Sequence, residues 1–250
     1  MRKISASYII SNVGVPLKNG ILVLNDDNSV AELIDRKGSV KEIQDLEYYS
    51  GVLVPGFVDV FTFLSWPDMN TGSIKSNDLS KLPLGELGDI QMIQKAINHL
   101  EAFGTKGAAD FFPSQKSHDL KINSKLIIRD IHDISGIYTS KLFSEFSSTV
   151  LGRLFPNNIS SDKAFCIGTG SLSSHLKLSV FEELKYLKTI KTDLSLEQQI
   201  KWACLNGADA LGFDQLGSFE VGKKPGVNLI THLDYDNFCL KSDSKLKVIV

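Results

Sequence analysis

The sequence predicts an α/β protein in which both termini form one small β-sandwich and the middle forms a separate α/β unit. Both ends consist of short runs rich in β-branched and aromatic residues, with turn residues such as Asn19-Gly20 between them. The middle alternates strand-like and helix-like runs. We therefore divide the chain into a composite β-sandwich, residues 1–54 with 214–250, and an α/β domain at 55–213.

The composition is that of an ordinary globular protein. The 250 residues are 42% hydrophobic and 22% charged, with a formal net charge of -2, which gives no reason to expect nucleic acid or an anionic membrane as partner. No stretch approaches the ~18 apolar residues of a membrane span, and the N-terminal apolar run is too interrupted for a signal peptide. Cys166, Cys204 and Cys239 are widely spaced in apolar contexts, so we expect free thiols in a cytoplasmic protein.

The predicted strands of the termini are short. At the N-terminus they are ISASYII, GILVLND, SVAELID and EYYSGVLV, and at the C-terminus GSFE, VNLITHL and KLKVIV.

The middle supplies four strand-like and four helix-like runs. The strands are VLVPGFVDVFTFL, GAADFF, KLIIRDIHDI and KAFCIGTG, and the helices are expected at 89–103, 140–152, 178–190 and 195–207. Asp89 and Ser195 are the expected N-caps of the first and last helices, and Gly104 and Gly207 their stops. A full eight-stranded α/β barrel takes about 250 residues and rarely fewer than about 200. Four strand–helix units therefore predict about half a barrel.

The run VPGFVDVFTFL (residues 54–64) resembles the first barrel strand of the amidohydrolase superfamily. In that family, two histidines that hold a catalytic divalent metal stand at the positions of Phe61 and Phe63. Alternate residues of a strand point the same way, so the two phenyl rings are expected to lie together where the resemblance places the metal. A phenyl ring has no lone pair for a metal ion.

Three later segments also resemble this family. IGTGSL (167–172) is similar to its last barrel strand, with Gly170 at the place of the metal-binding aspartate. LNGADALGF (205–213) is similar to its closing helix, and GSFEVGKKPGVNLI (217–230) to its closing segment. The stretch between KLIIRDIHDI and KAFCIGTG, where the family's next metal-binding histidines are expected, contains no histidine.

The resemblance implies a truncated TIM-barrel-like unit beside a β-sandwich, without a metal or another cofactor. The interpretation is a non-catalytic, amidohydrolase-like protein that binds a small molecule or a protein partner. The alternative is a hydrolase acting on carbon–nitrogen bonds other than peptide bonds, with a rewired or metal-free site.

The residues for that alternative lie on two neighbouring strands. In IIRDIHDI, Asp130 and His132 face one way and Asp133 the other, and Asp110 ends the preceding strand. A carboxylate beside an imidazole is a usable general base, which makes Asp110, His132 and Asp133 the candidate catalytic residues. The other explanation is an edge strand whose charges block aggregation.

Candidate ligand-binding residues follow the last strand. Two hydroxyls and an imidazole are expected near the position of the family's metal, those of Thr169, Ser171 and His175. The polar loop 65–88 is placed to cover the mouth of the half-barrel or to bind a partner. Four strands leave two free edges, so the sequence also predicts a homodimer that covers them.

Overall fold

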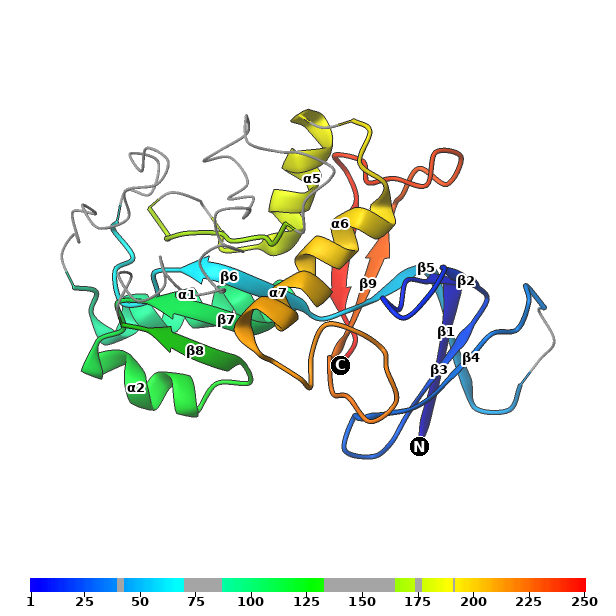
Figure 1. Cartoon of the computed structure of the whole chain (residues 1–250), viewed down its shortest axis with the longest axis horizontal. Coiled ribbons are helices and arrows are strands. Elements are labelled where there is room, and N and C mark those ends of the chain that lie inside the picture. The colour runs from blue at the N-terminus through cyan, green and yellow to red at the C-terminus, as the bar shows by residue number, and fades with distance from the viewer. Residues whose placement is uncertain (40–42, 70–86, 133–164, 174–176, 191) are drawn as a thin grey trace.

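Two sheets organise the described part of the chain (Figure 1). The computed structural model describes residues 1–39, 43–69, 87–132, 165–173, 177–190 and 192–250. The predicted helix 140–152 and most of the loop 65–88 lie outside these residues.

The strands are β1 (Arg2–Ile9), β2 (Leu17–Lys18), β3 (Ile21–Leu24), β4 (Val30–Ile34), β5 (Leu46–Pro55), β6 (Phe57–Thr62), β7 (Thr105–Phe111), β8 (Ile127–Ile131), β9 (Val227–Thr231) and β10 (Lys245–Val248). The helices are α1 (Ile90–Ala102), α2 (Gln115–Ile122), α5 (Val180–Ile190), α6 (Leu196–Ala203) and α7 (Leu205–Leu211).

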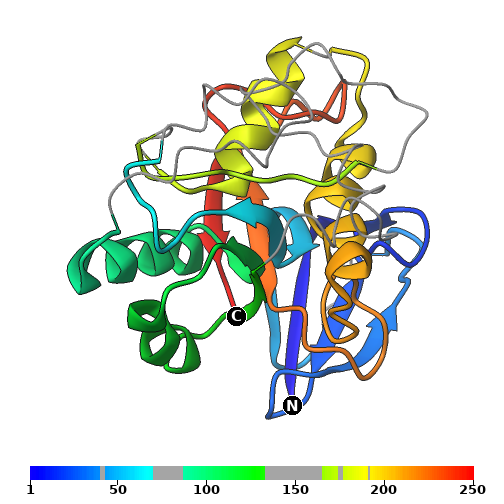
Figure 2. The same cartoon turned by 60° about the vertical axis from the view of Figure 1, so that its left-hand side comes forward.

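The larger sheet, here the composite sheet, combines the two termini as predicted. Its order is β10-β9-β5-β1-β3-β4, with β2 beside β1. β5 pairs in parallel with β1 on one side and antiparallel with β9 on the other, so the C-terminal strands continue the N-terminal sheet. Both ends of the chain lie on it (Figure 2). The described strands of the termini form this one sheet, and a two-layered sandwich stays a prediction.

The smaller sheet, here the barrel-like sheet, consists of the parallel strands β6, β7 and β8. The segment 165–170 lies on the free side of β6 through a parallel bridge between Thr62 and Gly170. The fold is thus mixed α/β, and the described strands do not form a closed barrel.

The predicted run VLVPGFVDVFTFL is two strands, not one. β5 ends at Pro55 in the composite sheet, and β6 begins at Phe57 in the barrel-like sheet. The backbone N–H of Gly56 between them donates to Pro225 O at 3.0 Å. A continuous apolar pattern does not reveal this change of sheet, because residues on both sides of the break are buried.

Helix α1 begins and ends as predicted, with the Asp89 carboxylate accepting from Met92 N at 2.8 Å. The helix predicted at 195–207 is instead two helices, α6 and α7, because Cys204 has a non-helical backbone. The break lets α6 pack beside β5 and β9 while α7 covers β6. At Gly207 a side chain would press on Val58 and Val60, so this close approach needs glycine.

The core comprises several apolar clusters that join helices to strands. Helices α5 and α6 pack on β5, β9 and the start of β6, whereas α1 packs on β7. Cys166 and Cys204 are buried, Cys239 is half-buried, and none of the three forms a disulfide. Among the described residues, no helix is long and apolar enough to cross a membrane.

Candidate functional site

The candidate site lies at the carboxyl ends of β6, β7, β8 and the segment 165–170, where barrel proteins build their sites. Three backbone hydrogen bonds hold the last segment to β6: Val60 N to Ile167 O, Phe63 N to Gly170 O and Gly170 N to Phe61 O, at 2.8–3.0 Å. The strands that resemble the first and last strands of the family are therefore neighbours.

Phenyl rings fill the space beside β6. Phe61 and Phe63 are 1% and 0% exposed, and their ring centroids lie 4.9 Å apart, edge to face. Phe111 of β7 packs on Phe61 with centroids 4.7 Å apart. The prediction that Phe61 and Phe63 lie together in an apolar core is confirmed.

Gly170, at the place of the family's aspartate, adopts the left-handed backbone conformation, with φ +77°. A side chain at such a position is strained. The backbone conformation at this position therefore suits glycine.

A buried carboxylate, that of Asp59, lies between β6 and the segment 165–170. Asp59 is fully buried, and it accepts hydrogen bonds from the backbone N–H and the hydroxyl of Thr169, at 3.0 and 2.6 Å. Burial raises the pKa of Asp59 to about 7, although the bonds from Thr169 and from Phe61 N act in the opposite direction.

The described start of the loop after β6 lies over the strand ends. Trp66 Nε1 donates to Phe112 O at 2.6 Å. The hydroxyls of Ser171 and Ser173 both donate to the carbonyl oxygen of Met69. These bonds join the loop to two strands at once. Ser171 and Thr169 are thereby committed to internal hydrogen bonds rather than presented to a ligand.

A charged cluster that sequence reasoning missed lies beside the phenyl rings. Lys121 Nζ is 2.5 Å from Asp110 Oδ2 and 2.6 Å from Asp130 Oδ1, and the lysine side chain is only 7% exposed. The other oxygen of Asp110 accepts from Leu64 N at 2.8 Å. Burial raises the pKa of Asp110 to about 6, while Lys121 acts to lower it.

Lys121 was missed because α2 was not predicted. The sequence predicted no helix between 103 and 140, whereas residues Gln115–Ile122 are helical. Only Ser117 and Lys121 of the helix are buried, so no apolar period marks it. The one available signal was Ser114, a residue of the type that favours N-caps.

The other predicted site residues are not gathered around Asp110 in the described structure. His132 follows β8 and is exposed, and no hydrogen bond or ion pair joins it to Asp110. Asp133 and His175 lie outside the described residues. Asp130 does lie beside Asp110, as the strand register requires.

The donor set does not fit the metal that the family implies. Phe61, Phe63 and Gly170 have no donor atoms in their side chains, and Asp110 is paired with Lys121. In the described ranges no three His, Cys, Asp or Glu side chains are grouped as metal ligands.

Comparisons with known proteins agree with this architecture. The model of the amidohydrolase family matches residues 154–246. Aminofutalosine deaminase of Helicobacter pylori superposes with a TM-score of 0.62 at 12% identity, covering 93% of this chain and 92% of that one. Guanine deaminase from C. acetobutylicum gives 0.61 at 11% identity, with 92% and 90% covered. Adenosine deaminase from Xanthomonas campestris, solved with bound zinc, gives 0.56 at 13% identity, with 91% and 84% covered.

No curated protein matches the chain. The structural likenesses define the class of fold, a mixed α/β fold shared with deaminases. Together with the family match, they confirm the resemblance to the amidohydrolase superfamily. That Phe61, Phe63 and Gly170 stand at the metal-ligand positions of that superfamily stays a prediction from the resemblance.

Proposed function

We propose that this chain is a non-catalytic, amidohydrolase-like protein that binds a small molecule or a protein partner. The observation that carries the proposal is the packing of Phe61 and Phe63 where the resemblance places metal-binding histidines. A hydrolytic metal needs about three protein ligands and one open position. Here the same space holds edge-to-face aromatic contacts, which contribute to the core.

Element analysis of the purified protein tests this proposal. We expect zinc, iron, manganese and nickel all to be far below one ion per chain. The Phe61→Ala variant is a control, because a metal held elsewhere on the chain would survive the change. Stoichiometric metal in the original protein that disappears on changing β6 would overturn the proposal.

The alternative is a hydrolase for carbon–nitrogen bonds, and one observation favours it. Asp110 is a buried carboxyl group with a pKa raised to about 6, the range of a useful general base. Its candidate partners remain His132 and Asp133. Deaminase and amidase assays decide between the two functions. A turnover abolished by Asp110→Asn, with unfolding unchanged, would establish the enzyme.

We further propose a cytoplasmic homodimer. The free thiols suit a reducing compartment. β8 pairs only with β7 in the described sheet, so its outer edge is available to a second copy. We keep the proposed division of each subunit into two domains, residues 1–54 with 214–250 and residues 55–213. Light scattering at micromolar concentration tests the dimer, and a monomer mass would refute it.

A further inference from the structure

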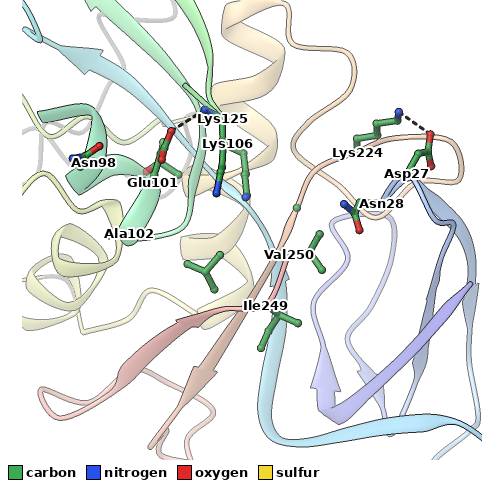
Figure 3. A pocket seen from close by; sticks show the side chains of 13 residues that line it. Asp27, Asn28, Asn98, Glu101, Ala102, Lys106, Lys125, Lys224, Ile249 and Val250 are labelled. Atoms are coloured by element: carbon green, nitrogen blue, oxygen red, sulfur yellow. Dashed lines mark hydrogen bonds and ion pairs between the residues drawn. The ribbon is translucent and has the colours of Figure 1, made fainter. Parts of the chain in front are cut away.

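A cavity of about 680 Å³ lies at the amino end of β7, the opposite end of that strand from Asp110 (Figure 3). We call it the lysine pocket. It forms where the end of α1 and the starts of β7 and β8 face the composite sheet. Its lining residues are Asp27, Asn28, Asn98, Glu101, Ala102, Thr105, Lys106, Lys125, Lys224, Gly226, Val248, Ile249 and Val250.

Two ammonium groups point into this pocket side by side, those of Lys106 and Lys125 (Figure 3). Neither ammonium has an ion pair with a described residue. Of the two acidic residues in the lining, Asp27 pairs with Lys224 at 2.7 Å, and Glu101 accepts the backbone N–H of Lys125 at 2.8 Å. Three lysines, Lys106, Lys125 and Lys224, thus face two carboxylates, and the pocket lining carries an excess of positive charge.

The stem of Lys106 is held by two glycines. A Cβ atom at Gly56 would lie 2.3 Å from Lys106 Cγ, and one at Gly226 would lie 2.5 Å from Lys106 Cε. Gly226 also has φ +71°, which disfavours other residues. The side chain is thus half-buried along its methylenes, with its charged end at the pocket.

The surroundings oppose the charge on Lys106. Burial, and then the nearby Lys125, lower its pKa, although Glu101 acts in the other direction. Thr105 also lines the pocket, and its buried hydroxyl has no hydrogen-bond partner among the described residues. An anion would relieve the repulsion between the lysines and offer acceptor oxygens to both.

We propose that the lysine pocket binds a small organic phosphate monoester, with the phosphate between Lys106 and Lys125. A doubly charged head matches two adjacent ammonium groups, and lysine is a usual phosphate ligand. The cavity is larger than a phosphate ion needs. Ala102, Ile249 and Val250 line it with apolar surface for the rest of the molecule. The site is remote from Phe61 and does not depend on whether the strand-end site is catalytic.

Calorimetry with ribose 5-phosphate, inorganic phosphate, ribose and succinate tests the proposal. We expect ribose 5-phosphate to bind best, inorganic phosphate more weakly and ribose not at all, with affinity falling as salt increases. Lys106→Met keeps the stem and removes the charge, so it should weaken binding by about tenfold or more, as should Lys125→Met. Lys201→Met, at an exposed site on α6, is the matched control and should bind normally.

Thermal unfolding of each variant shows whether it is folded. Lys125 is exposed, so Lys125→Met tests the site even if Lys106→Met does not fold. The proposal is overturned if ribose 5-phosphate does not bind the original protein, or if both pocket variants bind it as well as the control does. Tighter binding of succinate than of ribose 5-phosphate would overturn the phosphate assignment.

Discussion

The carboxylate of Asp59 accepts two hydrogen bonds from one residue, Thr169, although 110 positions separate them in the chain. One bond comes from the backbone N–H and the other from the hydroxyl. Both residues are fully buried. The pair thus fixes the segment 165–170 against β6 by a side chain as well as by the backbone.

The burial of Asp59 makes stability depend on pH. The pKa of Asp59 is about 7 in the folded protein against an ordinary value of 3.8, so between these values the folded state holds a proton that the unfolded state has released. The contribution of Asp59 to the free energy of unfolding is therefore fully present below about pH 4 and is lost as the pH rises to about 7.

The variant Asp59→Asn isolates this effect, because asparagine keeps the shape and does not titrate. Urea unfolding at pH 5 and at pH 7.5 should show a smaller loss of stability in the variant than in the original protein. Asp110, whose pKa is also raised, remains in both. Equal losses in the two proteins would contradict the assignment to Asp59.

The double change Phe61→His with Phe63→His should destabilise the protein without creating activity. Replacing a buried phenylalanine by alanine costs roughly 3–5 kcal/mol of stability. A buried imidazole adds a further cost, because its nitrogens would lack hydrogen-bond partners in this apolar core. Urea unfolding measures the loss, and deaminase assays with added zinc test the activity. A hydrolytic rate gained by this change alone would show that the remainder of a metal site persists.

Lys121→Met should destabilise the protein strongly, because Asp110 would lose the ammonium that faces it in the core. Breaking a buried ion pair by removing one partner costs about 3–5 kcal/mol. Adding Asp110→Asn should recover part of the loss, since the fully buried carboxylate is then removed and only the partly exposed Asp130 lacks its partner. Lys116→Met, on the exposed side of the same helix, is the control and should change stability little. Equal effects at the two lysines would refute this account.

Ser195→Ala should lower the free energy of unfolding by about 1 kcal/mol. Ser195 and Gln198 form a reciprocal capping box at the start of α6, with both bonds at 3.1 Å. Ser114 occupies the same position before α2, but its side chain makes no capping bond. Ser114→Ala should therefore cost much less in the same denaturation experiment, and similar costs would contradict the capping argument.

Local signals in the sequence predicted a large part of the fold. Asp89 and Gly104 bound α1 as expected, because capping chemistry acts within one turn. The alternation of Phe61 and Phe63 predicted that these side chains lie together, because the period of a strand is two. The change of sheet at Gly56 and the break at Cys204 were missed, since each depends on what the chain packs against.

Less of the candidate functional site than of the fold could be predicted from the sequence. The replacement of metal ligands at Phe61 and Phe63 followed from the resemblance, but the pairing of Asp110 with Lys121 did not. Lys121 reaches Asp110 from a short helix without an apolar period. The lysine pocket combines residues from both ends of the chain, and no local sequence pattern predicts that they lie together.

The arrangement of the strands has a consequence for synthesis on the ribosome. β5 needs β9, which ends at Thr231, and β6 needs the segment that ends at Gly170. Strands β1 to β5 pair with one another, but one edge of β5 and the free side of β6 emerge before their partners exist. Contacts so distant in sequence form slowly, and unpaired strands are prone to aggregate. Until β9 has been made, one edge of β5 therefore lacks its partner strand.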